Sequence, residues 1–195
     1  MADFFVRDPK APLAERMRPA HFDEVVGQRH LLGPGKPLRL AFEAGQPHSM
    51  ILWGPPGVGK TTIARILAKC LNCEQGITSE PCGECNSCQE ISQGRFVDLI
   101  EVDAASRTKV EDTREILDNV QYAPTRGRFK VYLIDEVHML SQSAFNAFLK
   151  TLEEPPAHVI FILATTEKHK IIPTILSRCQ IFDFKRIGVL DAKNY

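Results

Sequence analysis

A glycine-rich segment in the first third of the chain has the residue types of a phosphate-binding loop. Its eight residues follow the pattern G-x-x-x-x-G-K-[ST], in which backbone N–H groups converge on one anion. The lysine of this pattern neutralises the β- and γ-phosphates, and the hydroxyl after it can hold Mg²⁺. The predicted nucleotide-binding residues are Gly54, Pro55, Pro56, Gly57, Val58, Gly59, Lys60, Thr61 and Thr62.

The loop stands in the context that the pattern requires. An apolar run over 50–53 precedes it, and a helix-compatible stretch over 62–71 follows it. A helix that begins here points the positive end of its dipole at the same phosphates. The segment therefore predicts a nucleotide-phosphate site.

Two acids at the end of another apolar run form a second candidate group. The run over 131–134 leads directly into Asp135 and Glu136. Asp135 is placed to hold Mg²⁺, directly or through water, and Glu136 to polarise the water that attacks a γ-phosphate. A surface acidic pair that merely caps a strand is the alternative, but the phosphate loop earlier in the chain favours the catalytic interpretation.

Two threonines follow the apolar run over 160–164. A hydroxyl of Thr165 or Thr166 could contact the γ-phosphate or the attacking water. Turn residues or a helix cap are the alternative. On the residues alone, this second interpretation is preferred.

Four of the six cysteines form a cluster with metal-ligand spacing. Cys73, Cys82, Cys85 and Cys88 give C-x₈-C-x₂-C-x₂-C, and four thiolates suit tetrahedral Zn²⁺ at about 2.3 Å per bond. The surrounding segment, 72–90, is polar and interrupts the rhythm of the chain, so it needs a cross-link such as a metal. A redox pair is the alternative, which the additional cysteines disfavour. Four thiolates leave no open position, so the zinc is expected to be structural.

Cys70 complicates this assignment, because it also forms C-x₂-C with Cys73. It falls on the apolar side of the predicted helix, where a free cysteine packs well. We therefore predict Cys73, and not Cys70, as the ligand.

The elements that must position these groups alternate along the chain. Strands are predicted at 49–53, 97–102, 129–134, 159–164 and 180–184, and helices at 61–71, 110–120, 141–152 and 171–176. Strand runs that are apolar throughout indicate a sheet buried on both faces, and strand–helix alternation predicts a parallel, doubly wound α/β fold. In such folds the ligand lies at the carboxyl ends of the strands. Residues 1–20 are expected to be an extended or loosely packed lead-in.

The composition is that of an ordinary soluble globular protein, with 44% hydrophobic and 25% charged residues. No apolar run is long enough for a membrane span, and the N-terminus lacks a signal-peptide core. We therefore expect a cytoplasmic protein without membrane contact, in which cysteines serve metal binding or packing. The formal net charge is zero, so any DNA contact must come from local patches or from several subunits together.

Several stretches resemble the AAA+ ATPases of DNA clamp loaders. From about 62 to 184 the chain is similar to the tau/gamma subunit of bacterial DNA polymerase III. The matching stretches are 63–65, 71–73, 94–101, 103–110, 135–140, 149–156 and 177–179, with the zinc cysteines. Residues 13–19, 27–33 and 48–57 look closer to RarA/MgsA-type ATPases of stalled replication forks. Because both families share the fold, the chain could be a chimera joined near the phosphate loop.

The resemblance implies a five-stranded P-loop NTPase fold with a small zinc-binding insertion. It implies binding and hydrolysis of ATP, coupled to loading of a sliding clamp on primed DNA, with ATP/ADP, Mg²⁺ and Zn²⁺ as cofactors. The implied partners are other clamp-loader subunits, the sliding clamp and primer–template DNA. A replication-fork recombination ATPase and a nucleotide-binding scaffold with little activity are the alternatives, and the zinc segment argues against the first of them.

The resemblance also assigns residues that spacing alone leaves open. It favours Thr166 as the γ-phosphate contact, and it implies that Arg178 acts as an arginine finger on a neighbouring subunit's ATP. A surface salt bridge of Arg178 is the alternative. Three basic residues around a predicted helix start either contact DNA phosphates or form a solvated face. They are Arg107, Lys109 and Arg114.

We expect residues 1–195 to form the AAA+ base domain, with 72–90 as the insertion within it and without the helical lid that carries a second arginine. A lidless domain is expected to bind nucleotide weakly to moderately, to hydrolyse it slowly, and to be monomeric in isolation.

Overall fold

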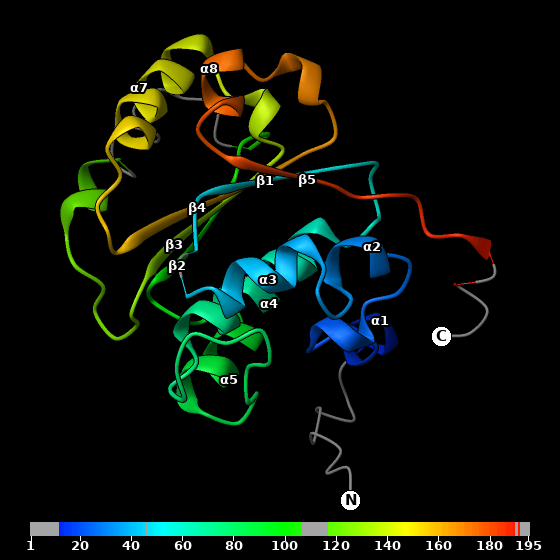
Figure 1. Ribbon diagram of the computed structural model, residues 1–195. Helices are drawn as coiled ribbons and strands as arrows, with labels where there is room; N and C mark the ends of the chain where they lie inside the picture. The colour runs from blue at the N-terminus through cyan, green and yellow to red at the C-terminus, as the bar shows by residue number, and fades with distance from the viewer. Residues whose placement is uncertain (1–11, 46, 107–116, 190, 192–195) are drawn as a thin grey trace, which may run out of the picture.

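Five parallel strands form a central sheet in the computed structural model, which describes residues 12–45, 47–106, 117–189 and 191. The strands lie in the spatial order β2-β3-β4-β1-β5 (Figure 1). Their bounds are β1 Met50–Trp53, β2 Leu99–Asp103, β3 Lys130–Asp135, β4 Val159–Thr165 and β5 Gln180–Asp183. The predicted parallel α/β fold is confirmed.

Helices cover both faces of this sheet (Figure 1). On one face lie α3 (Pro37–Glu43) and α4 (Lys60–Asn72), with α5 (Asn86–Ser92) against α4; α7 (Gln142–Glu153) and α8 (Pro173–Leu176) lie on the other. The short remaining segments are α1 Leu13–Arg16, η1 Phe22–Glu24, α2 Arg29–Leu32, η2 Asn119–Gln121, η3 Val137–Met139 and η4 Lys168–Lys170. Within the described part of the chain, no helix has the length and apolarity to cross a bilayer.

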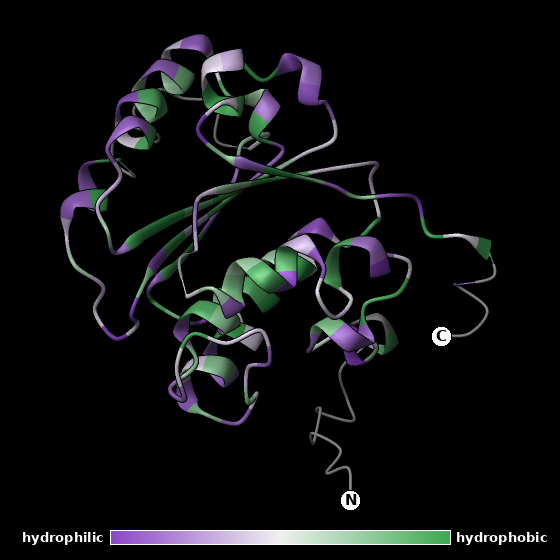
Figure 2. Ribbon diagram, viewed as in Figure 1, coloured by the Kyte–Doolittle hydropathy of each residue, from purple (hydrophilic) through white to green (hydrophobic). Residues whose placement is uncertain are grey.

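The central strands divide the hydrophobic core into two halves. Met50 and Leu52 pack with α4, whereas Ile51 packs with α7 and α8, because successive side chains of a strand point to opposite faces. On the second face the ring of Phe161 stacks on Tyr132, with centroids 5.3 Å apart. The strands are accordingly apolar where they cross the middle of the molecule (Figure 2), as burial on both faces requires.

The predicted strands begin and end within two residues of the observed ones. Expectations for three other segments are either corrected by the structure or fall outside the described residues. The lead-in contains α1 in its described part, so it is not extended throughout. The polar segment 72–90 runs into α5, whose Ile91 is buried in the core. This apolar contact attaches the segment to the rest of the domain, although the composition of 72–90 does not indicate it. The predicted helix over 110–120 lies largely outside the described residues.

A buried carboxylate explains why β2 begins two residues later than predicted. Asp98 is 1% exposed and accepts hydrogen bonds from the backbone N–H groups of Thr125, Arg126 and Gly127, each at 2.7 Å. Gly127 is needed in this turn because a Cβ there would lie 2.5 Å from the side-chain oxygen of Asn72. The turn fixes how the chain enters β3, whose far end carries the predicted acids.

Replacing Asp98 with alanine is expected to lower the free energy of unfolding by about 2–4 kcal/mol, because the turn loses three hydrogen bonds to a buried, charged acceptor. Chemical denaturation measures the change. Asp118, an exposed aspartate in the same part of the chain, is the matched control, and its change to alanine should cost less than about 0.5 kcal/mol. Equal losses for the two variants would contradict the role given to Asp98.

Candidate nucleotide-binding site

The glycine-rich loop joins the carboxyl end of β1 to the start of α4. Gly57 and Gly59 have φ angles of 78° and 88°, a region that favours glycine. Gly54 is required for a different reason, because a Cβ there would lie 2.5 Å from the carbonyl oxygen of Phe184, directly after β5. Glycines therefore shape the loop both by conformation and by close packing.

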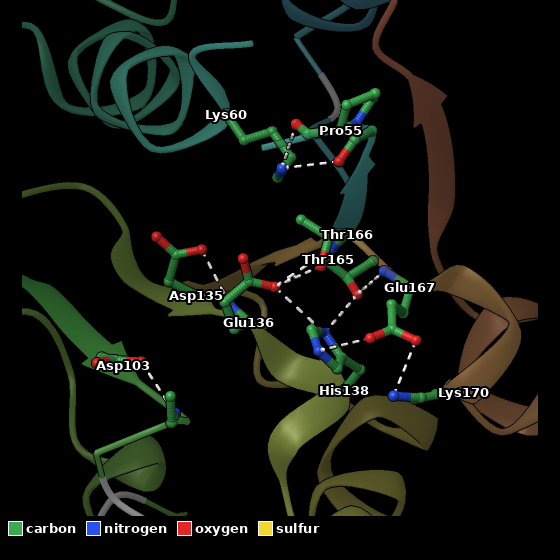
Figure 3. A network of polar contacts seen from close by, with 12 residues as sticks. Pro55, Lys60, Asp103, Asp135, Glu136, His138, Thr165, Thr166, Glu167 and Lys170 are labelled. Atoms are coloured by element: carbon green, nitrogen blue, oxygen red, sulfur yellow. Dashed lines mark hydrogen bonds and ion pairs between the residues drawn. The ribbon is translucent and has the colours of Figure 1, made fainter. Parts of the chain in front are cut away.

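Lys60, the first residue of α4, folds its side chain back over the loop (Figure 3). Its Nζ donates to the carbonyl oxygens of Gly54 at 2.8 Å and Pro55 at 3.0 Å. Burial lowers the pKa of Lys60, while the nearby charges of Glu136 and Asp135 oppose this shift. A largely buried ammonium whose direct partners are carbonyl oxygens is stabilised by an incoming anion, and a phosphate supplies one.

The acids reach the loop because of the strand order. β4 lies between β1 and β3, so the carboxyl ends of three parallel strands meet at one edge of the sheet. There the hydroxyl of Thr61 donates to a carboxylate oxygen of Asp135 at 2.7 Å. The two residues offer oxygen ligands of the kind that Mg²⁺ prefers.

The end of β4 holds the carboxylate of Glu136. Thr166 donates to its Oε2 from the backbone N–H at 3.3 Å and from the hydroxyl at 3.1 Å. Thr165 is fully buried as the last residue of β4, and its hydroxyl accepts the N–H of Glu167 at 3.0 Å. Of the two threonines, Thr166 is therefore the one whose hydroxyl is bonded to the predicted catalytic glutamate.

A pocket of about 350 Å³ beside the loop is a feature that sequence reasoning missed. It is lined by residues 17–19, 25–26, 57–59, 62–63 and 187. The N-terminal segment, the start of α4 and the segment after β5 each supply part of the wall, so the predicted lead-in belongs to the site. Mostly apolar pockets of this kind hold flat organic rings. In the sequence of the N-terminal segment, only the apolar pair at 25–26 indicated that this segment could line a pocket.

The four cysteines come together at the far end of α4. Their Sγ atoms all lie within 4.8 Å of one another, close to the separation of about 3.8 Å that tetrahedral Zn²⁺ with 2.3 Å bonds would give. Cys73 caps the carboxyl end of α4 and Cys85 the amino end of α5. Cys70 is buried in the apolar core instead.

The chemistry of these thiols fits a cation. Burial raises the pKa of Cys73 and Cys88. Burial also opposes ionisation of Cys82, but hydrogen bonds from the backbone N–H groups of Cys85 and Glu84 outweigh it and lower the pKa to about 7. Buried thiols ionise when a metal supplies positive charge, so the set fits a tetrathiolate metal site.

Arg178 lies away from this edge of the sheet. It directly precedes Cys179 and β5, and β5 runs parallel to β1, so it stands at the edge opposite the loop. Its guanidinium donates to the carbonyl oxygen of Thr174 and to Glu153 Oε1, both at 2.6 Å. In this structure it therefore makes the salt bridge that was the alternative to an arginine finger.

The three basic residues considered for DNA contact are not placed by the structure. Arg107, Lys109 and Arg114 lie outside the described residues.

Comparison with known proteins gives consistent matches. A family model described as "DNA polymerase III, delta subunit" matches residues 38–188. DNA polymerase III subunit tau of Salmonella typhimurium is 65% identical over 91% of this chain and 27% of its own length. DNA polymerase III subunit gamma of Buchnera aphidicola subsp. Schizaphis graminum is 55% identical over 94% of the chain and 50% of its own length. The chain thus spans between about a quarter and a half of these relatives.

A solved structure shares the fold. The RuvB Holliday junction branch migration motor of Thermotoga maritima has a TM-score of 0.64 and 23% identity over 91% of this chain and 52% of its own; at this identity the likeness concerns the fold alone.

The matches bear on the N-terminal segment as well. Since the similarity to tau covers 91% of the chain, it includes most of residues 1–60, which the sequence alone associated with a replication-fork ATPase. A separate origin of that segment stays a prediction. Because the family model spans more than half of the chain, the chain belongs to the DNA polymerase III delta subunit family, and the relatives that it resembles are tau and gamma subunits.

Proposed function

We propose that this chain is the ATP-binding and ATP-hydrolysing base domain of a DNA polymerase III clamp-loader subunit of the tau/gamma kind. The observation that carries the proposal is the hydrogen bond between Thr61 and Asp135, which brings the phosphate loop and the acidic turn together at one edge of the sheet. Residues 1–195 form this domain, and 72–90 are its zinc-binding insertion.

The nucleotide lies along that edge. Its phosphates accept hydrogen bonds from the backbone N–H groups of residues 57–61, because the prolines at 55 and 56 have none to donate, and Lys60 lies beside the β- and γ-phosphates. The base occupies the pocket of about 350 Å³. Thr61 and Asp135 hold Mg²⁺, which neutralises phosphate charge when bound.

Hydrolysis uses the turn after β3. Glu136 polarises the attacking water, and the hydroxyl of Thr166, now bonded to Glu136, contacts the γ-phosphate or that water. Lys60 neutralises the charge that develops on the transferred phosphoryl group. The low local dielectric around the largely buried ammonium of Lys60 strengthens this interaction.

Arg178 acts on the nucleotide of a neighbouring subunit. It stands at the sheet edge opposite its own loop, and its salt bridge with Glu153 must open for this role. Since the finger comes from another chain, hydrolysis depends on assembly.

The partners are other DNA polymerase III subunits, a sliding clamp and primer–template DNA, in the cytoplasm. The similarity to tau and gamma over most of the chain supports this choice, and a replication-fork recombination ATPase is not favoured. A scaffold without its own activity is the remaining alternative, and hydrolysis assays decide between it and an enzyme.

Glu136→Gln is expected to reduce ATP hydrolysis roughly 100-fold or more while nucleotide affinity stays within about threefold, because the amide keeps the shape but cannot act as a base. Lys60→Ala should instead weaken ATP binding. Phosphate release and equilibrium binding of a fluorescent ATP analogue separate the two effects. If the unmodified chain shows no hydrolysis at any concentration, the scaffold alternative stands and the enzymatic proposal fails.

Hydrolysis per chain is expected to rise with protein concentration, and Arg178→Ala should remove that rise, with a loss of roughly tenfold or more at high concentration. Arg95→Ala, a change at an exposed arginine of another face, is the control and should keep the rise. A rate that is independent of concentration in the unmodified chain would count against completion of the site in trans.

One zinc ion per chain is expected by elemental analysis, and Cys85→Ser should lose it. Metal removal should lower the free energy of unfolding by roughly 3 kcal/mol, or Tm by about 6–12 °C for a chain of this size. Without the metal, thiolates would repel one another, or the thiols would have to be buried in their neutral form. Cys179→Ser, outside the cluster, serves as control and should keep the metal. Zinc well below one per chain would refute the assignment.

A further inference from the structure

A buried histidine two residues after the predicted catalytic glutamate has no role in the function described so far. The His138 side chain is 6% exposed and lies between the carboxylates of Glu136 and Glu167 (Figure 3). Its Nδ1 is 3.2 Å from Glu136 Oε2 and 3.0 Å from the hydroxyl oxygen of Thr165. Its Nε2 faces Glu167 Oε1 at 3.7 Å.

The hydrogen-bonding capacity of the neighbours determines what the ring must donate. A carboxylate only accepts, so a hydrogen bond to Glu136 requires a hydrogen on Nδ1 of His138, and the hydroxyl oxygen of Thr165 beside Nδ1 can share that hydrogen. On its other side the ring faces Glu167, which is held in turn by Lys170 at 2.8 Å and His169 at 3.5 Å. The hydrogen bond from Lys170 lowers the pKa of Glu167, so this carboxylate keeps its charge beside the ring.

Glu136 needs such support because its backbone is in an unfavourable conformation. Its φ of 47° is the one positive value at a non-glycine residue in the described part of the chain, and such conformations persist where the surroundings hold them. The backbone N–H of Thr166, the hydroxyl of Thr166 and Nδ1 of His138 all contact Oε2 of Glu136. The other oxygen of Glu136 points toward the side on which Lys60 lies (Figure 3).

We infer that His138 is a positioning residue for ATP hydrolysis: by holding Oε2 of Glu136 through Nδ1, it aims the free oxygen of this carboxylate at the phosphate site. The inference rests on the proposed hydrolysis and names the group that orients its base. His138 itself touches neither the phosphate loop nor the proposed Mg²⁺ ligands in the contacts described above.

Two amide substitutions distinguish the role of Nδ1 from that of Nε2 in the His138 ring. In His138→Asn the side-chain NH₂ can occupy the position of Nδ1, whereas in His138→Gln it reaches only the position of Nε2. With the whole chain, we expect kcat of the Asn variant to stay within about threefold of the original, and kcat of the Gln variant to fall about tenfold or more. Nucleotide affinity should change less than twofold in both, because the contacts of the ring described above are with Glu136, Thr165 and Glu167 and not with the phosphate loop or the proposed Mg²⁺ ligands.

His169→Ala is the matched control, since this exposed histidine also contacts Glu167 but lies outside the contacts to Glu136. It should leave kcat and Tm unchanged. Equal activity of the Asn and Gln variants, whether both retained or both lost, would overturn the role of Nδ1. A loss of activity that follows Tm across the variants would show a structural role only, and would overturn the proposal as well.

A double-mutant cycle tests the contact without using activity. In nucleotide-free chain, the effects of His138→Gln and Glu136→Ala on the denaturation midpoint should be non-additive, because each removes the same contact. Additive effects would overturn the inference. If the unmodified chain does not hydrolyse ATP, the proposed function fails while the cycle still decides whether His138 holds Glu136, so the two failures are distinguishable.

Discussion

The parallel order β3-β4-β1 is the constraint on which the site depends. In a parallel sheet the carboxyl ends of neighbouring strands lie at one edge, so three loops that are far apart in the sequence meet there. The loop after β1 leads into Lys60 and Thr61 at the start of α4, β3 ends at Asp135 with Glu136 directly after it, and β4 lies between β1 and β3. The strands are held in this order by a core that is buried on both faces.

This arrangement concentrates polar groups where the sheet would otherwise be apolar. Lys60 is largely buried against backbone carbonyls, and Glu136 has a positive φ. Both features disfavour the folded chain locally and are found where a protein prepares a site for a ligand or a reaction. The large apolar core on either side of the sheet offsets that cost.

α4 links the nucleotide site to the cysteine cluster. Its first turn carries Lys60, and its last residue, Asn72, accepts the backbone N–H of Phe129 at 2.9 Å just before β3. Arg128 donates to the carbonyl oxygen of Cys73 at 2.6 Å. The cluster is therefore attached to the strand that leads to the proposed catalytic acids, and it holds the start of that strand from outside the sheet.

The sequence by itself determined the features whose chemistry is local. The phosphate loop, the acids Asp135 and Glu136 and the cysteine spacing are each contained in one short segment, and apolar runs located all five strands to within two residues. The tertiary structure alone decided which threonine meets Glu136, the pocket wall made by the N-terminal segment, and the position of His138. These contacts join segments distant in the chain, and no local periodicity encodes them, because strand order and side-chain direction arise only when both faces of the sheet are packed.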